Sequence, residues 1–273
     1  MLSVLKQISN GPAFHRAVTG AKKLWYGGRG EPIQYGRHML RYVPGTRPVR
    51  LKYLNSPDVT TSNDVRQIKF FLENIQPGDF VLDVGGHYGQ YAVLFASLVS
   101  DTGRAITFEP DPAARELLRK NLALNGCADR VEIESVALFD RDGEHCFFSR
   151  GADSMSSLAR SGLGSNASSP QVKEFSVSTA RLDEYLVRKN KGWPQWVKLD
   201  TEGAEINILR GAHQLLRSGA TIVCELHPYA WPEFGTSFAE LLSIVHKCDR
   251  KIEYLDKSLV IEDGAVYGSA IIR

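Results

Sequence analysis

Apolar and polar residues alternate along this chain in a pattern that predicts strands and helices in turn. Short apolar runs predict buried strands at 80–84, 104–108, 131–138, 195–199 and 221–226, and two further strands at 252–255 and 265–272. Apolar residues at three- to four-residue spacing predict helices at 63–74, 90–100, 111–125, 182–188, 205–217 and 237–247. This order favours an α/β fold with a mostly parallel, doubly wound sheet and right-handed crossovers.

Two segments depart from this order. Residues 1–60 are rich in Gly, Pro and Arg, and they predict an N-terminal arm with a short helix and irregular or hairpin structure. Residues 61–273 form the main domain, in which Asn63 is the expected N-cap of the first helix. This domain carries an insertion at about 141–195, predicted to hold strands at 146–149 and 172–178. The Ser-rich part of the insertion is expected to be either a plain loop or a cover over the substrate.

The composition is that of an ordinary globular protein, with 43% hydrophobic and 23% charged residues. The four cysteines have neither C-x-x-C nor zinc-finger spacing, so we expect free thiols in a reducing compartment. No run of about 18 apolar residues predicts a membrane span, and the first ten residues lack a signal-peptide pattern. We therefore expect a cytoplasmic protein. The sequence is also compatible with a homo-oligomer.

The net charge of +2 conceals an uneven distribution. Residues 1–60 contain ten basic and two acidic residues, which gives the arm a charge of +8 and leaves −6 on the remainder. A basic arm favours an anionic substrate or surface, although a solvated arm has the same composition. The main domain has no strong nucleic-acid motif, so we expect no DNA partner, and an RNA substrate guided by the arm is an alternative.

The candidate chemistry lies at the carboxyl ends of the predicted strands, where open α/β sheets bind ligands. Asp83 is followed by a glycine-rich loop that contains Gly85, Gly86, His87, Tyr88 and Gly89. Glycines let a ligand approach the backbone, and the N-terminus of the next helix attracts a carboxylate or phosphate. Glu109 ends the following strand, where a carboxylate can accept both hydroxyls of a ribose. We infer an adenosine-containing cofactor.

The dinucleotide motif G-x-G-x-x-G would need glycine where this chain has Val84. The missing glycine argues against a nicotinamide-dependent oxidoreductase, which stays an alternative together with a non-catalytic adenosine-binding protein.

Several blocks carry a more specific likeness: residues 77–85, 108–112, 136–138 with Gly143, 156–158, and 198–205 followed by 209–212. In these blocks the chain resembles the FkbM family of methyltransferases, which has a Rossmann-like class I methyltransferase fold. The likeness spans about 63–227 and leaves the arm outside. The family usually has Ala-Asn where this chain has Gly86-His87.

The resemblance implies a seven-stranded sheet with helices on both faces and an antiparallel last strand. It also implies S-adenosylmethionine as methyl donor and a hydroxyl oxygen as acceptor. The expected function is O-methylation of a sugar, a glycoside or a small natural product. The expected cofactor-binding residues are Asp83, Gly85, Gly86, His87, Tyr88, Gly89, Glu109, Pro110, Val136, Ala137 and Asp200.

A hydroxyl acceptor must lose its proton, so a general base is expected near the donor. Asp200 is a candidate base or cofactor contact, and Glu202 either orients the acceptor or caps a helix. His227, at the end of the next strand, is either a base or a structural histidine. These three are the predicted catalytic residues. Asp200, Glu202 and Glu225 are chemically compatible with Mg²⁺, but carboxylates often line pockets without metal, so we predict no metal ligands.

Overall fold

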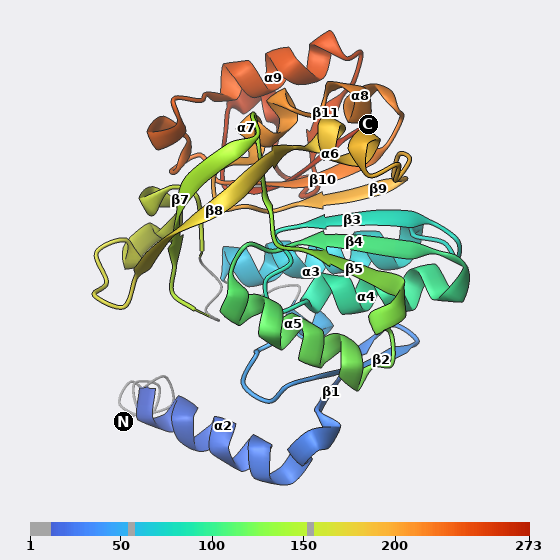
Figure 1. The fold of residues 1–273 in the computed structure, drawn as a ribbon, viewed down its shortest axis with the longest axis vertical. Helices are drawn as coiled ribbons and strands as arrows, with labels where there is room; N and C mark the ends of the chain where they lie inside the picture. The colour runs from blue at the N-terminus through green and yellow to red at the C-terminus, as the bar shows by residue number, and fades with distance from the viewer. Residues whose placement is uncertain (1–11, 54–57, 152–155) are drawn as a thin grey trace.

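A computed structural model describes residues 12–53, 58–151 and 156–273. The first ten residues, whose sequence lacks a signal-peptide pattern, lie outside the described residues. The centre of the fold is a seven-stranded sheet in the order β11-β12-β10-β9-β3-β4-β5 (Figure 1). The strands are β3 (Phe80–Val84), β4 (Arg104–Phe108), β5 (Val131–Glu134), β9 (Trp196–Leu199), β10 (Thr221–Leu226), β11 (Ile252–Tyr254) and β12 (Gly268–Ile272). Only β12 runs antiparallel to its neighbours, which confirms the predicted fold class and the antiparallel last strand.

Helices cover both faces of this sheet (Figure 1). One face carries α3 (Val59–Asn74), α4 (Gln90–Val99) and α5 (Pro112–Leu124). The other carries α6 (Leu182–Arg188), α7 (Glu205–Arg210), α8 (His213–Arg217) and α9 (Phe238–Lys247). Successive strand residues point to opposite faces, so Val81 packs in one core and Leu82 in the other. Burial on both sides explains why the central strands β3, β4, β9 and β10 are mostly apolar.

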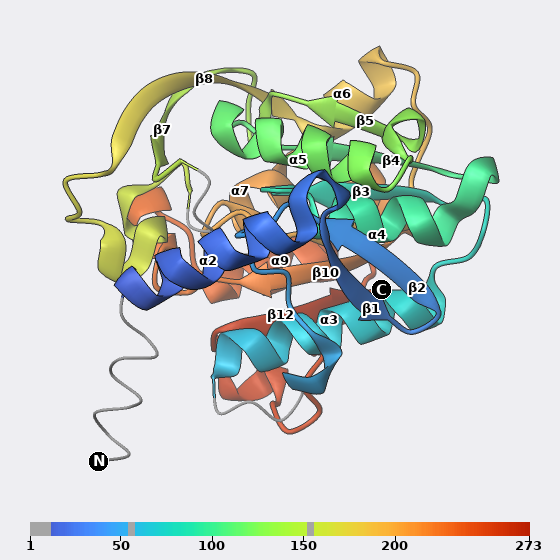
Figure 2. The same cartoon turned by 90° about the horizontal axis from the view of Figure 1, so that it is seen from below.

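The arm packs on the main domain through a hairpin. Helix α2 (Pro12–Tyr26) leads into β1 (Glu31–Tyr35) and β2 (His38–Tyr42), and Figure 2 shows α2 on the outer side of this hairpin. Tyr35 and Tyr42 are fully buried, and the Tyr42 hydroxyl donates to the Gln90 carbonyl at 3.0 Å. The Gln90 side chain in turn accepts from the Val49 amide at 2.8 Å. The hairpin thereby fixes the first turn of α4, which directly follows the glycine loop.

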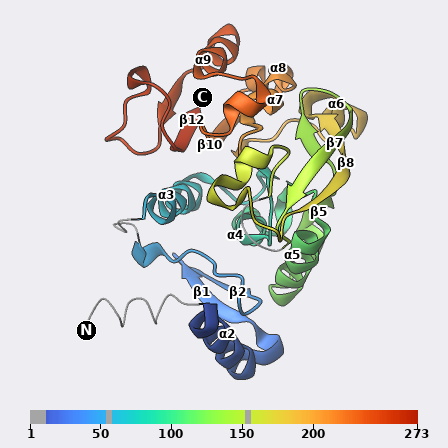
Figure 3. The ribbon, with the colours of Figure 1, turned by 90° about the vertical axis from the view of Figure 1, so that its left-hand side faces the viewer.

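The insertion builds a second, three-stranded sheet from β6 (Ala137–Phe139), β7 (Gly143–Ser149) and β8 (Lys173–Arg181) in the order β6-β8-β7 (Figure 3). The Ser157 hydroxyl donates to the Glu202 carbonyl at 2.8 Å, and the Arg160 and Ser161 amides donate to the Glu233 carboxylate. The first bond holds the insertion against the loop that follows β9, and the other two hold it against the 3-10 helix at Trp231–Phe234, which follows β10. Short 3-10 helices lie at Gly27–Arg29, Leu51–Tyr53, Ser100–Thr102, Ala128–Arg130, Arg160–Asn166, Trp231–Phe234 and Ile261–Asp263.

Three element predictions were wrong in detail. The single strand expected at 131–138 is two strands, because β5 pairs with β4 in the main sheet whereas β6 pairs with β8 in the small one. The single helix expected at 205–217 breaks between α7 and α8. The Asp183 carboxylate causes this break by accepting from the Gln214 and Leu215 amides at 2.7 and 3.0 Å, which starts a new helix there.

The third correction concerns the start of α3. The helix begins at Val59, and Asp58 is its N-cap, with its carboxylate accepting from the Thr61 amide. Asn63, the expected cap, is buried inside the helix and accepts from the Ser269 amide at 2.9 Å. Asn63, whose residue type is typical of a helix N-cap, therefore joins α3 to β12.

Candidate active site

The glycine loop after β3 is shaped by contacts within the protein. The Gly85 and Gly86 amides both donate to the Phe108 carbonyl at 3.0 Å, and Gly85 has a φ of +87°. A Cβ atom on Gly85 would lie 1.7 Å from the Asp200 carbonyl oxygen, and one on Gly86 would lie 2.1 Å from Thr107 Oγ1. The loop thus needs glycine in order to pack against the ends of two neighbouring strands, whether or not a ligand is bound.

Glu109 ties this loop to the next strand and helix. One of its carboxylate oxygens accepts from the His87 amide at 2.6 Å, and the other accepts from the Asp111 amide at 2.7 Å. Asp111 in turn caps α5. Burial raises the pKa of Glu109 to about 7, although the two backbone hydrogen bonds favour the ionised form. The carboxylate keeps lone pairs free for a ligand hydroxyl.

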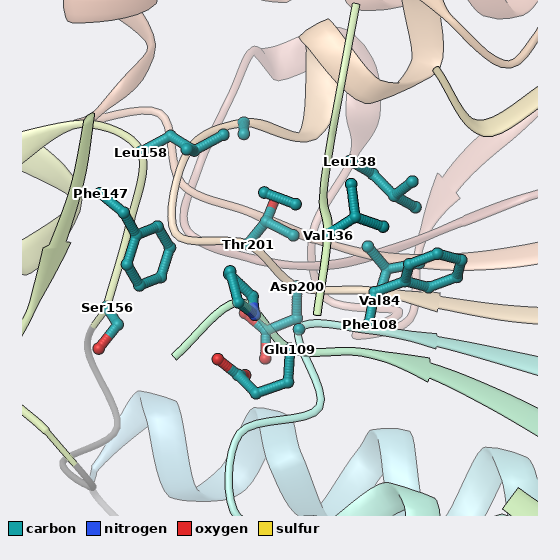
Figure 4. A pocket seen from close by; sticks show the side chains of 14 residues that line it. Val84, Phe108, Glu109, Val136, Leu138, Phe147, Ser156, Leu158, Asp200 and Thr201 are labelled. Atoms are coloured by element: carbon teal, nitrogen blue, oxygen red, sulfur yellow. The ribbon is translucent and has the colours of Figure 1, made fainter. Parts of the chain in front are cut away.

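A pocket opens to solvent beside Glu109. Six of the predicted cofactor-binding residues line it: Gly85, Glu109, Pro110, Val136, Ala137 and Asp200. Figure 4 shows Phe147 and Leu158 of the insertion on the side opposite Val84, Phe108 and Leu138, with the Glu109 carboxylate between the two groups. Apolar walls with one carboxylate are suited to a flat base attached to a ribose.

The other predicted cofactor residues do not line this pocket. Tyr88 donates its hydroxyl to the Gln90 side chain at 3.0 Å and is therefore turned towards the hairpin. Gly86, His87 and Gly89 shape the backbone of the loop. Asp83 is fully buried below it.

The Asp83 carboxylate has one unsatisfied oxygen. Its Oδ2 accepts from Thr107 Oγ1 at 3.2 Å, whereas Oδ1 has no hydrogen-bond partner among the residues that the structure describes. Burial raises the pKa of Asp83 to about 6. A buried carboxylate oxygen that accepts no hydrogen bond from the described residues is suited to an ammonium group, as the methionine part of the expected cofactor would supply.

Lys198 is a buried cation that the sequence interpretation did not assign to the site. Its Nζ lies 2.9 Å from Asp200 Oδ2 and 3.9 Å from Asp83 Oδ1. Burial alone would lower the pKa of Lys198, but Asp200 and Asp83 outweigh it and raise this pKa above its usual value. A signal was present, because a lysine in a buried strand needs an anionic partner, and Asp200 lies two residues on, on the same side.

The three predicted catalytic residues do come together. His227 Nε2 lies 3.4 Å from Glu202 Oε2 and 3.9 Å from Asp200 Oδ1. On the other side of the ring, Nδ1 lies 2.9 Å from Oε1 of the fully buried Glu205. Glu205 also accepts from the Gly203 amide and from the indole of Trp231. Glu205 therefore holds His227 and the loop in place, which explains a carboxylate with no exposed surface.

The charged groups in this cluster shift one another's pKa values. Burial would raise the pKa of Asp200, but Lys198 and His227 lower it below its usual value. Burial raises the pKa of Glu202 to about 8. Burial would lower the pKa of His227, whereas Glu202 and Glu205 raise it well above the ordinary range. One ionised carboxylate thus stands beside a pair that shares a proton.

Further polar residues around the cluster were not predicted. The Tyr229 hydroxyl donates to Glu202 at 2.9 Å. Gln67 and Tyr267 donate to the two oxygens of Glu225 at 2.6 and 2.5 Å. Tyr229 follows His227 closely and was open to prediction, but Gln67 lies on α3 and Tyr267 just before β12, so only the folded chain brings them together.

Comparison with known proteins decides the family. Residues 83–252, more than half of the chain, match the methyltransferase FkbM domain. This chain belongs to the FkbM methyltransferase family. Every predicted site residue, from Asp83 to His227, lies within the matched segment. The family assignment makes the chain an S-adenosylmethionine-dependent methyltransferase and favours that function over a nicotinamide-dependent oxidoreductase.

Individual relatives are distant. The 2-O-methyltransferase NoeI of Sinorhizobium fredii is 28% identical over 59% of this chain and 67% of its own length. The hexuronic acid methyltransferase AglP of Haloferax volcanii is 26% identical over 72% and 77%. Among solved structures, an S-adenosylmethionine-dependent O-methyltransferase from Thermotoga maritima matches with a TM-score of 0.43 and 13% identity, over 89% of this chain and 76% of that one. None of the helices described here has the length and apolarity needed to cross a membrane.

Proposed function

We propose that this protein methylates a hydroxyl group of a sugar or glycoside with S-adenosylmethionine as donor. One observation carries the proposal: Asp200 lines the pocket beside Glu109 and also lies 3.9 Å from His227 Nε2. The donor pocket and the acid–base cluster therefore share a wall. The two named relatives, a 2-O-methyltransferase and a hexuronic acid methyltransferase, support a sugar as the acceptor.

The residues of the pocket fit the donor. Glu109 would accept the ribose hydroxyls, the apolar walls would enclose the adenine, and Oδ1 of Asp83, which accepts no hydrogen bond from the described residues, would receive the ammonium group. When bound, the cofactor supplies an electrophilic methyl group on a sulfonium. The protein must then bring the acceptor oxygen into line with that methyl group and exclude water.

The Asp200, Glu202 and His227 cluster would bind the acceptor hydroxyl and take its proton as the new O–C bond forms. Because Lys198 keeps Asp200 ionised, Asp200 would accept a hydrogen bond from the hydroxyl. Glu202, whose carboxylate lies 3.4 Å from His227 Nε2, would take up the proton. Placing the hydroxyl between fixed groups saves the entropy of orientation, and a positioned base adds to the rate.

The test is a screen of sugars, with S-adenosylhomocysteine formation and the methylated product measured by mass spectrometry. Neutral hexoses, hexuronic acids and glycosides should be included, because the basic arm favours an anionic acceptor. Asp200→Ala should abolish transfer, whereas Asp101→Ala, at a position 91% exposed, should leave it unchanged. Donor binding without methylation of any sugar would refute the acceptor class, and full activity of Asp200→Ala would refute the assignment of the cluster.

A further inference from the structure

The cluster at the ends of β9 and β10 has the dimensions of a metal site. One donor atom each from Asp200, Glu202 and His227 lies within 4.8 Å of the other two. Metal–ligand bonds of about 2.0–2.2 Å at angles between 90° and 109° place neighbouring donor atoms about 3.0–3.4 Å apart. The observed distances of 3.4 Å from His227 Nε2 to Glu202 and 3.9 Å to Asp200 require only a small contraction.

The surroundings of His227 direct its free nitrogen towards the two carboxylates. The side chain is 2% exposed, and Nδ1 faces Glu205, which accepts hydrogen bonds from all its described partners. This acceptor holds Nδ1 and turns Nε2 towards the two carboxylates, where a metal ion would take the place of a second ring proton, as in histidines that bind metals. Among the residues that the structure describes, Nε2 makes no hydrogen bond of normal length, since its nearest carboxylate oxygen is 3.4 Å away.

The two carboxylates are held in a similar way. Lys198 binds Asp200 Oδ2 at 2.9 Å and leaves Oδ1 on the side of His227. Tyr229 donates to Glu202 at 2.9 Å. Partners outside the ligand shell that fix each ligand are a feature of metal sites in proteins.

The surroundings of the three side chains are acidic. Five buried or partly buried carboxyl groups lie around Lys198 and His227: Asp83, Asp200, Glu202, Glu205 and Glu225. Such a set attracts a cation, and a divalent ion brings two charges where a proton brings one.

We propose that Asp200, Glu202 and His227 bind a divalent cation that accepts mixed oxygen and nitrogen ligands, for which Mn²⁺ is the natural probe. The site itself is independent of the acceptor, but its role rests on the proposed function. An acceptor hydroxyl bound to the ion beside the donor pocket would lose its proton more readily, because the cation lowers the pKa of that hydroxyl. The proton would pass to the Glu202 carboxylate oxygen that does not bind the ion.

Binding of Mn²⁺ to the full chain, measured by electron paramagnetic resonance and calorimetry with S-adenosylhomocysteine present, tests the site. We expect one ion per chain, with coupling to a nitrogen nucleus that His227→Gln removes. Glu202→Gln should weaken binding at least tenfold. It is the decisive variant, because this side chain is 17% exposed and we expect its conservative substitution to leave the fold intact, which circular dichroism checks. Zn²⁺ and Mg²⁺ in competition would rank the preferred ion.

Glu225→Gln is the matched control. Glu225 Oε1 also lies 3.8 Å from His227 Nε2, but its oxygens already accept from Gln67 and Tyr267, so this variant should bind Mn²⁺ within about threefold of wild type. The proposal is overturned if wild type shows no saturable Mn²⁺ binding up to millimolar concentration. Equal weakening by Glu225→Gln and Glu202→Gln would also overturn it, since that result indicates diffuse acidity.

Methyl transfer with and without a chelator separates this inference from the proposed function. Undiminished sugar methylation after chelation, together with absent Mn²⁺ binding, would reject the metal and leave the function in place. Specific Mn²⁺ binding without methylation of any sugar would keep the site and reject the acceptor class.

Discussion

Replacing Lys198 by methionine tests the electrostatic account of the site. The substitution keeps the length of the side chain and removes a cation that is 2% exposed. At an effective dielectric constant of about 20, the distances of 2.9 and 3.9 Å correspond to attractions of about 6 and 4 kcal/mol. Desolvation of the ammonium group offsets several kcal/mol of this sum. We expect Lys198→Met to lower the free energy of unfolding by about 3–5 kcal/mol at pH 7.

Protonation limits this loss and gives it a pH dependence. An aspartate that has lost its cationic partner can take up a proton. For an ordinary pKa of about 3.9, this protonation costs about 4 kcal/mol at pH 7 and about 1.5 kcal/mol at pH 5. The folded variant then binds more protons than the unfolded chain above about pH 4, so its stability rises as the pH falls. The stability of wild type also rises over this range, though by less, because the pKa of its Asp83 is already raised to about 6. The difference in free energy of unfolding between wild type and Lys198→Met should therefore narrow by about 1–2 kcal/mol from pH 7 to pH 5.

Urea unfolding followed by tryptophan fluorescence at pH 5 and pH 7 measures both quantities. Lys120→Met is the matched control, since Lys120 pairs with Glu116 on the surface, and it should show no measurable change at either pH. A loss below about 1 kcal/mol at pH 7, or a loss that does not depend on pH, would refute the reasoning.

Three further predictions concern the loop, the donor pocket and α8. Gly85→Ala should lower the free energy of unfolding by about 2–5 kcal/mol. The control Gly219→Ala has nearly the same φ of +88° but no atom within 4 Å of the added Cβ, so it should lower this free energy by only about 1–2 kcal/mol. Equal losses in urea unfolding would contradict the close contact at Gly85. Glu109→Gln should weaken calorimetric binding of S-adenosylmethionine about 10- to 100-fold. In wild type that binding should weaken as the pH falls through about 7, because the carboxylate is then protonated, and the variant should show no such step. Asp183→Ala should cost about 1–2 kcal/mol by thermal or urea unfolding, because two backbone amides of α8 lose their acceptor; an unchanged midpoint would argue against the cap.

Sequence periodicity predicted the main sheet because its central strands are buried on both faces and are therefore mostly apolar. It failed where the choice depended on a distant partner. The apolar run at 131–138 looks uniform, and only pairing with β8, about 40 residues later, moves β6 into a second sheet. The helix at 205–217 is likewise interrupted by Asp183, a residue on another helix.

The candidate site was predictable to the extent that it lies at strand ends. Asp200, Glu202 and His227 were identified because the carboxyl ends of parallel strands meet at one edge of the sheet. The sequence did not predict the contacts of Glu205, Gln67 and Tyr267, because each acts through another side chain. Their importance follows from the folded geometry, which no local pattern encodes.

Gly85 and Asp200 show why the donor loop and the acid–base cluster are not independent parts. The Asp200 amide donates to the Val84 carbonyl at 3.0 Å, and the Asp200 carbonyl occupies the space that a side chain at position 85 would fill. Any larger residue at 85 must therefore push the end of β9 away. The same movement would shift the Asp200 carboxylate from Lys198 and His227. Substitution of this glycine should thus impair proton removal as well as donor binding, although Gly85 has no side chain that could take part in either step.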